Sequence, residues 1–523
     1  MQSVMKTKLI VLFALFISLF AEAQTYPVNL HATLKKGYEK LKKGESVVIT
    51  GVSHSTEIKS TYAQSNATID NPAALTDKFA LIINEKEVSI KDDMDEIFDF
   101  QFQTTQDIWD AIIISKVLAK LEKKGMQVSL RKDMENDALE YIARVKNTGL
   151  ELKDPFLENY IYSVIAKIAP ETIIDGRPGN INILLVDDAS ENACMYPNGT
   201  LVLHSGLIAR LHSEDELAAI LSHEIAHFIL DHGVQNVNKA IARKKRAEFW
   251  AAVATGITAA AEVTAAAKNR YYVPGAATLG MAVLTSSIAS QVVERLGMLY
   301  NHEQETDADF VAKKIITQAG YDSNALATAL NRLQESMVKE RSTAMYFSSY
   351  THPSLIKRIL DAGSPKELND GRFERIVSAA VSSAARMKFE DRRFRQAYEL
   401  FEQNINLNVA TSSDYVMQAQ CLLCLKDTKE SNNRALEWVN RARALSPENI
   451  NIDKAEILVR LRLNQTAQAI TLLEEYKTRL LNMERDTKSL YSEELWTEQH
   501  LFVDPELLWA NSMIVRLKGM LGK

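Results

Sequence analysis

The chain is poor in three residue types: its 523 residues include only 3 cysteines, 11 prolines and 19 glycines. The shortage of cysteine excludes a scaffold held together by disulfides. The shortage of proline and glycine favours a helix-rich protein. Basic residues are not in excess, since the formal net charge is -6, so no nucleic-acid partner is expected. Hydrophobic residues make up 46% of the chain. A chain of this length can therefore bury a large core, and we expect two to four domains.

The first apolar run, residues 9–20, is too short to span a membrane as a helix. It follows the positive charges of Lys6 and Lys8 and precedes the triplet Ala21-Glu22-Ala23. This order is typical of a secretory signal peptide, so residues 1–23 are predicted to be cleaved. No cysteine follows the run, which argues against a lipoprotein anchor, and we expect a periplasmic or otherwise exported protein. The alternative is an uncleaved membrane anchor, which also leaves the bulk of the chain outside the cytoplasm.

Two later apolar segments, residues 249–267 and 275–293, are rich in alanine and long enough to cross a membrane. Glu262 and several threonines weaken their hydrophobicity, so we expect helices that pack over the protein core. The alternatives are transmembrane helices and a peripheral membrane contact through residues 249–293.

Residues His223-Glu224-Ile225-Ala226-His227 spell H-E-x-x-H inside a segment with a helical pattern, residues 214–230. Residues four apart lie on the same face of a helix, so the two imidazoles can bind one metal ion. Glu224 lies beside them and can act on a water bound to that ion. A zinc peptidase also needs a third protein ligand and leaves the fourth position for water. An acidic segment downstream offers four candidates on a second helix: Glu303, Glu305, Asp307 and Asp309.

The pattern around this motif predicts a mostly helical core with a small sheet. Helices are expected at 133–146, 155–169 and 205–211, and strands at 182–186 and 199–204. The strand at 199–204 could add an extended substrate to a sheet edge. Two other histidines lie near the motif in sequence. His232 is off the four-residue spacing and is predicted to be structural. His204, which ends the strand, is predicted to be satisfied by packing, with a place in the lining of the cleft as the alternative.

Residues 24–129 are harder to interpret. Strands are expected at 46–52 and 78–84 and a helix at 105–124. The segment could be a pro-region, a small accessory domain or a substrate-facing appendage.

The C-terminal third contains three amphipathic stretches that begin at Ala397, Ala435 and Ala469. Their spacing is close to the 34-residue period of tetratricopeptide repeats, and a solenoid of such repeats offers a concave surface to peptides or proteins. The alternative is an ordinary helical bundle. Cys421 and Cys424 form a C-x-x-C pair in this part. We interpret them as two small buried helix residues, with a redox or metal pair as the alternative.

Residues 300–309, Y-N-H-E-Q-E-T-D-A-D, resemble the Y-S-R-x-x-E-x-x-A-D segment of the HtpX-like/BepA-type zinc metallopeptidases. Four further blocks resemble family segments in the family order: 192–199, 205–208, 215–218 and 351–359. The chain departs from the pattern where Asn301 and His302 replace Ser-Arg and where Cys194 replaces an aromatic residue. The resemblance covers residues 130–362, and the periplasmic branch of the family also carries tetratricopeptide repeats.

The resemblance implies a role for each site residue. Glu305 is the third ligand beside His223 and His227, with Glu303 as the alternative. Asp309 is a carboxylate that orients a ligand histidine. His352 lies near the metal, either to stabilise the oxyanion or to occupy the fourth position as a latch, unless it is an ordinary loop histidine.

Together these patterns predict an α+β, predominantly helical fold with a zincin-type (gluzincin) core. The expected parts are a signal peptide at 1–23, an accessory region at 24–129, a zinc metallopeptidase domain at 130–365, tetratricopeptide-like repeats at 385–480 and a helical tail at 481–523. The expected function is that of an exported endopeptidase with one Zn²⁺ per chain and Glu224 as general base. The expected partners are protein or peptide substrates, such as misfolded envelope proteins, and proteins bound by the repeats. The alternatives are a latched protease that acts as a chaperone-like scaffold and a membrane-associated protease.

Overall fold

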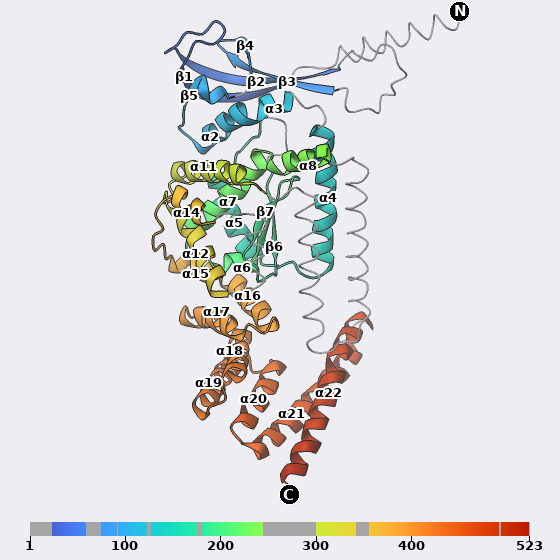
Figure 1. The fold of residues 1–523 in the computed structure, drawn as a ribbon. Helices are drawn as coiled ribbons and strands as arrows, with labels where there is room; N and C mark the ends of the chain where they lie inside the picture. The colour runs from blue at the N-terminus through green and yellow to red at the C-terminus, as the bar shows by residue number, and fades with distance from the viewer. Residues whose placement is uncertain are drawn as a thin grey trace, which may run out of the picture.

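A computed structural model describes residues 24–58, 75–91, 93–122, 127–174, 180–243, 300–340, 355–490 and 493–521. The predictions for residues 1–23, for residues 249–293 and for His352 lie outside these described residues. Three parts follow one another along an elongated molecule: an N-terminal sheet, a central mixed part and a C-terminal row of helices (Figure 1). The predicted class is confirmed at this level, because the described residues are mostly helical and form two small sheets. No helix among the described residues is both long and apolar enough to cross a membrane.

The N-terminal part is an antiparallel five-stranded sheet in the order β4-β3-β2-β1-β5. Its strands are β1 (Gln24–Leu34), β2 (Ser46–Ile58), β3 (Leu75–Ile83), β4 (Lys86–Ser89) and β5 (Phe98–Gln101). A continuous helical segment follows, made of α2 (Thr105–Ile112), the π-helical turn η3 (Ile113–Val117) and α3 (Leu118–Glu122). The two strands expected from sequence lie within or overlap β2 and β3, and the expected helix corresponds to α2–α3.

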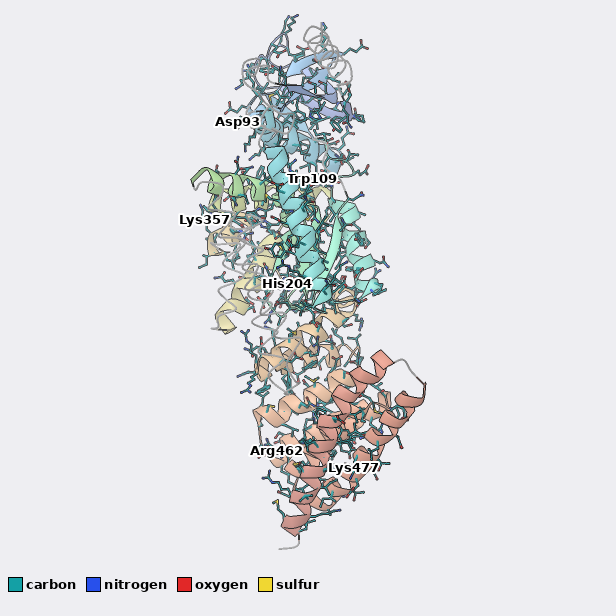
Figure 2. All side chains as sticks on the ribbon, turned by 90° about the vertical axis from the view of Figure 1, so that its right-hand side faces the viewer. Asp93, Trp109, His204, Lys357, Arg462 and Lys477 are labelled. Atoms are coloured by element: carbon teal, nitrogen blue, oxygen red, sulfur yellow. The ribbon has the colours of Figure 1, made fainter. Side chains whose placement is uncertain are left out.

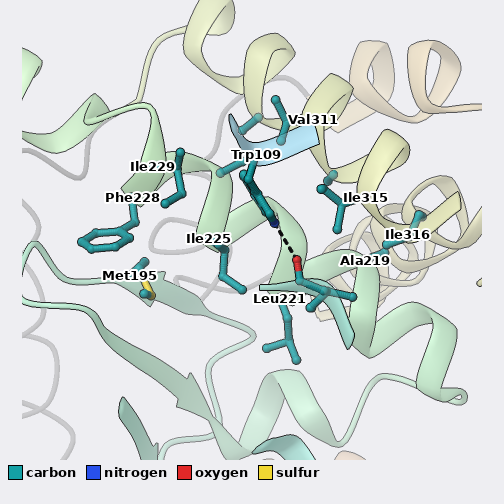
Figure 3. Packing of buried hydrophobic residues seen from close by; sticks show 14 of the residues in the cluster. Trp109, Met195, Ala219, Leu221, Ile225, Phe228, Ile229, Val311, Ile315 and Ile316 are labelled. Carbon is teal, nitrogen blue, oxygen red and sulfur yellow. Dashed lines mark hydrogen bonds between the residues drawn. The ribbon is translucent and has the colours of Figure 1, made fainter. Parts of the chain in front are cut away.

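Trp109 on α2 joins this part to the centre of the molecule. Its side chain is fully buried, and its indole Nε1–H donates to the carbonyl of Ile168, 2.8 Å away. Figure 3 shows the indole among side chains of two central helices, including Ile225 and Val311. In the side view, Trp109 lies where the N-terminal and central parts meet (Figure 2). The hydrophobic core is therefore continuous from the first sheet into the centre.

The central part is a three-stranded sheet surrounded by helices. It contains α4 (Gln127–Asn147), α5 (Pro155–Ile168), β6 (Asn182–Val186), β7 (Ala193–Met195), β8 (Thr200–His204), α6 (Ser205–Ile208), α7 (Glu214–Ile229), α8 (His232–Arg243), α11 (His302–Gln318), α12 (Ala325–Glu340) and α14 (Leu355–Ala362). The sheet order is β6-β8-β7, with β8 parallel to β6 and antiparallel to β7. The idea that residues 199–204 offer a sheet edge is therefore wrong, because β8 is hydrogen-bonded on both sides. Among the described strands, β7 is the edge strand on the side of α7.

The two helices that carry the site, α7 and α11, each begin with an N-terminal cap. Ser213 accepts a hydrogen bond from the backbone N–H of Glu216, and the first turn of α7 is acidic. Both features stabilise a helix N-terminus. Asn301 and Gln304 form a capping box at the start of α11, which satisfies backbone donors in both directions.

The C-terminal part continues as α15 (Gly371–Ile376), α16 (Ser378–Glu390), α17 (Phe394–Asn406), α18 (Ser412–Leu425), α19 (Lys429–Leu445), α20 (Ile450–Arg462), α21 (Thr466–Leu490) and α22 (Glu493–Leu521). From α16 onward each helix packs against its neighbour in the chain. Ala397, Ala435 and Ala469, which mark the three predicted repeats, are fully buried in α17, α19 and α21. This packing agrees with either a solenoid or a bundle, so the assignment to tetratricopeptide repeats stays a prediction. Cys421 is buried, Cys424 is exposed and both are free thiols.

Candidate metal centre

The H-E-x-x-H motif lies in the middle of α7, and all three of its functional side chains are buried. The exposed fractions are 2% for His223, 3% for Glu224 and 1% for His227. The four-residue spacing brings the two imidazoles together, with 3.0 Å between their Nε2 atoms. A helix that is buried on every side from Glu216 to Ile229 holds these polar groups in a fixed place away from water.

Glu305 on α11 completes a three-residue group with the two histidines. Its Oε2 lies 3.6 Å from His223 Nε2, and its Oε1 lies 3.6 Å from His227 Nε2. Among the described residues, these three form a group whose ligand atoms all lie within 4.8 Å of one another. Glu303, the alternative ligand, is exposed and is not part of the group.

The group fits a zinc ion in size. In a tetrahedral site with bonds of roughly 2.0–2.1 Å, neighbouring ligand atoms are about 3.3 Å apart. The two Nε2 atoms are 3.0 Å apart, and each lies 3.6 Å from one of the two oxygens of Glu305, Oε2 for His223 and Oε1 for His227, so these distances lie on either side of this value. Two nitrogens and one carboxylate oxygen are also the donor set that zinc takes in catalytic sites.

The formal charges fit as well. Three carboxylates are buried at the centre, on Glu224, Glu305 and Asp309, and they face one buried guanidinium, on Arg358. These groups leave two negative charges in excess. Uncompensated charge is costly in a protein interior, and a divalent cation neutralises this excess.

Asp309 lies one turn after Glu305 and contacts the first histidine. Its Oδ1 is 2.8 Å from His223 Nδ1, the ring nitrogen on the side away from His227. Burial alone would raise the pKa of Asp309, but the charges of Arg358 and His223 and their hydrogen bonds hold it below its usual range. Asp309 is therefore an anion that can accept the Nδ1–H of His223, and the orienting role that the resemblance implies for it stays a prediction.

Arg358 on α14 is the main site residue that the sequence did not single out. Its guanidinium makes two hydrogen bonds of 2.7 Å to Asp309 and lies 2.6 Å from Oε2 of Glu305. Burial disfavours the charged guanidinium, but the neighbouring carboxylates raise the pKa of Arg358. The sequence did contain one signal for Arg358. It is the arginine of the R-I dipeptide that closes the family pattern, and this dipeptide lies on an amphipathic helix, α14.

The second histidine has its own surroundings. Tyr300 stacks on the ring of His227, with 3.7 Å between ring centroids and 13° between planes. The Nδ1 of His227 lies 2.8 Å from Nδ1 of His232, a histidine that is 3% exposed. Burial lowers the pKa of His232 to about 3, so its ring is neutral at neutral pH.

Glu224 lines a pocket together with His223 and Arg358. Five aliphatic side chains line it: Leu207, Ile220, Leu330, Leu333 and Leu355. Asn192 and Ala193, from the start of the edge strand β7, line it as well. Glu191 also reaches the pocket, but its carboxylate accepts hydrogen bonds from Arg210 and Ser336. The pocket therefore offers apolar surface next to the group that would activate water.

His204 lies outside this group. Its Nδ1 is 2.7 Å from Ser190 Oγ, and the residue is 8% exposed. His204 is therefore buried and makes a polar contact away from the ligand group, and its role in packing stays a prediction.

Residues 155–365 match peptidase family M48. This part of the chain belongs to peptidase family M48. The predicted resemblance is thus confirmed, and the M48 domain contains His223, Glu224, His227 and Glu305. The sheet of β1–β5 and the helices from α15 onward lie outside it.

Curated relatives are similar over the same part. The beta-barrel assembly-enhancing protease of Escherichia coli is 26% identical over 224 residues, which are 42% of this chain and 41% of that protein. A putative beta-barrel assembly-enhancing protease of Vibrio cholerae is 25% identical over 223 residues, 42% of each chain. The mitochondrial metalloendopeptidase OMA1 of Schizosaccharomyces pombe is 28% identical over 177 residues, 34% of this chain and 43% of that protein. The matched part of the chain thus spans less than half of the length of each relative.

Proposed function

We propose that the protein is an exported zinc endopeptidase. The observation that carries the proposal is the buried group of His223, His227 and Glu305 with Glu224 beside it, at the edge of an apolar pocket. His223 and His227 would bind zinc through Nε2 and Glu305 through a carboxylate oxygen. A zinc ion in this place would polarise the scissile carbonyl and make a bound water acidic enough to react near neutral pH.

The protein's own side chains transfer the protons and hold the ligands in position. Glu224 takes the proton of the attacking water and delivers it to the leaving amine, so that the peptide bond breaks without a free amide anion. Asp309 holds the ring of His223 through Nδ1, which makes that ligand more basic. Arg358 holds the carboxylates of Glu305 and Asp309 in place.

The substrate would lie along β7 as an extended strand. The outer edge of β7 is free of a strand among the described residues, and its first residue, Ala193, lines the pocket with Glu224. Main-chain hydrogen bonds to an edge strand bind peptides with little sequence preference. The five aliphatic side chains of the pocket would accept an apolar side chain next to the scissile bond. Cleavage sites mapped by mass spectrometry should therefore have Leu, Ile, Val, Met or Phe beside the cut, and charged residues there would contradict this.

Envelope protein quality control is the biological role that fits best. Two relatives are named beta-barrel assembly-enhancing proteases, so this chain would act during the assembly of β-barrel proteins, and the predicted signal peptide would export it. The C-terminal helices would form tetratricopeptide-like repeats that recruit substrates or partner proteins. His352 would lie near the zinc as a latch or an oxyanion donor, and residues 249–293 would contact the membrane surface at most peripherally.

The test measures bound zinc and casein cleavage for the wild type, Glu224→Gln and His352→Ala. We expect one zinc per chain in each, and a loss of activity of at least about 10²-fold in Glu224→Gln. A gain of activity in His352→Ala would support the latch. Zinc without cleavage in any variant would favour a scaffold that uses its repeats, and the absence of zinc would overturn the ligand assignment, Glu305 first. If the protein can be extracted only with detergent, the membrane-associated alternative holds.

A further inference from the structure

We propose that His232 is a positioning residue for the metal ligand His227. In this arrangement the Nδ1 of His232 accepts the Nδ1–H of His227 and thereby holds the opposite ring nitrogen of His227 toward the metal. The inference rests on the proposed zinc site and adds a residue to it that its spacing alone would class as structural.

The two ring nitrogens of His227 have different neighbours. Its Nε2 faces the ligand group, 3.0 Å from His223 Nε2 and 3.6 Å from Glu305 Oε1. Its Nδ1 faces the other way and lies 2.8 Å from Nδ1 of His232. Both rings are buried, with 1% and 3% of the residue exposed. The nitrogen that contacts His232 is therefore the one that a metal on Nε2 would leave for a hydrogen bond.

Proton positions follow from this arrangement. A ring whose Nε2 lone pair binds a cation carries its proton on Nδ1, so His227 is the donor. The Nδ1 of His232 is then the acceptor, and His232 carries its own proton on Nε2. Metal-bound histidines commonly donate their second N–H to such a partner, which fixes the tautomer and the ring orientation.

The two metal histidines have chemically different partners. His223 meets the carboxylate of Asp309, whereas His227 meets an imidazole. A carboxylate in place of His232 would add a negative charge to a centre whose formal charges already match a divalent cation. An imidazole acceptor orients His227 without adding that charge.

Three neighbouring segments hold the two rings in place. His232 follows Asp231, which has a left-handed backbone (φ 62°) and forms a 2.5 Å ion pair with Arg131 of α4. Gln304 of α11 donates to the carbonyl of His232 at 3.4 Å. Tyr300 stacks on His227 from the segment before α11. The hydrogen bond between the rings is therefore built into the packing of α4, α8 and α11.

Three substitutions separate the hydrogen bond from packing. His232→Asn keeps a polar atom at the place of Nδ1, His232→Gln moves the polar atom to about the place of Nε2, and His232→Leu fills the volume without either. Zinc dissociation constants of the whole chain would be measured by competition with a chromophoric chelator. We expect the Leu and Gln variants to bind zinc roughly 10- to 100-fold more weakly and the Asn variant to stay close to the wild type.

Two spectroscopic measurements distinguish a positioning role of His232 from a role in packing alone. The visible spectrum of the Co²⁺-loaded chain should change in the Leu variant and be restored in the Asn variant, because the spectrum reports the ligand field. Nitrogen NMR of the zinc-loaded chain should show a protonated Nδ1 on His227 and an unprotonated Nδ1 on His232. The opposite tautomers would overturn the proposal.

The control is His204→Leu, which removes another buried histidine whose Nδ1 contacts a hydroxyl outside the ligand group. It should leave zinc affinity unchanged even where it lowers thermal stability. Wild-type affinity in His232→Leu, or equal weakening in the Asn and Leu variants, would overturn the positioning role while leaving the zinc peptidase intact. A wild-type chain that takes up no zinc would instead overturn the proposed function and this inference with it.

Discussion

At the scale of single residues, sequence patterns identify ligand types better than they identify their contacts. H-E-x-x-H defines two histidines on one helical face, and in α7 the Nε2 atoms of His223 and His227 are 3.0 Å apart. The choice between Glu303 and Glu305 rested on resemblance, since both are acidic and both lie in the first turn of α11. Burial of Glu305 and exposure of Glu303 separate them in the structure. Arg358 could not be identified from spacing, because its partners come from another helix.

The buried charge network gives a first prediction. Arg358→Leu removes the cation that faces Glu305 and Asp309, and leaving buried carboxylates unpaired costs about 3–5 kcal/mol. We expect this loss of stability in the zinc-free chain and a smaller loss when zinc is present, because the ion supplies replacement charge. Chemical unfolding with and without zinc measures both values. Arg358→Lys is the matched control, which keeps the charge without the paired hydrogen bonds and should cost less. Equal stability of Arg358→Leu and wild type without zinc would contradict the charge argument.

Asp110 gives a prediction about pH. Burial raises the pKa of this carboxyl, on α2, to about 7. Between about pH 4 and pH 7 the folded chain therefore holds a proton that the unfolded chain has lost. This contribution to stability is fully present below about pH 4, falls as the pH rises to about 7 and is then lost. Asp110→Asn should remove this dependence and be the more stable form at pH 8, which melting temperatures of both chains at pH 5 and pH 8 would show. If the melting temperatures of the wild type and of Asp110→Asn change equally between pH 5 and pH 8, the prediction is wrong.

At the scale of elements, local pattern predicted most of the central helices and strands but not their pairing. The predicted strand at 182–186 is β6 as observed, and the predicted helix at 214–230 differs from α7 by one residue. Strands β1, β4, β5 and β7 were missed, because β4, β5 and β7 are only three or four residues long and β1 pairs with residues far away in the chain. The edge role given to β8 was wrong for a related reason. Sheet order depends on long-range pairing, which alternation along one strand does not report.

A glycine at the corner between β8 and α6 gives an element-scale prediction. A Cβ on Gly206 would lie 2.2 Å from the carbonyl oxygen of Ala189, which is backbone and cannot rotate away. Gly206→Ala should therefore destabilise the chain by about 3 kcal/mol and lower its melting temperature. Gly371→Ala on α15 is the control, since a Cβ there meets nothing within 4 Å, and it should change stability by less than about 1 kcal/mol. Equal melting temperatures for the two variants would contradict this prediction, because they would show that the backbone near Ala189 moves aside without cost.

At the scale of the whole molecule, the structure indicates what residues 24–122 contribute, which the sequence left open. One hydrophobic cluster runs from β1 to α18, so this part shares its core with the rest of the molecule. Lys116 of η3 also forms a 2.7 Å ion pair with Asp307 of α11, two residues after Glu305, the proposed third ligand. The first sheet and its helices are therefore part of the body that carries the metal group.

Deletion of residues 24–122 should accordingly abolish stable folding of the M48 domain, because it exposes the apolar faces of α7 and α11 that pack on Trp109. A milder test is Trp109→Ala in the whole chain, which should cost about 3–5 kcal/mol through the cavity it leaves. Circular dichroism melting and zinc uptake measure both effects. The control deletion removes α21 and α22, whose core is formed with α20, and it should leave zinc uptake unchanged. If the chain without residues 24–122 folds and binds zinc like the whole chain, the first sheet is dispensable for the site and the pro-region interpretation becomes the better one.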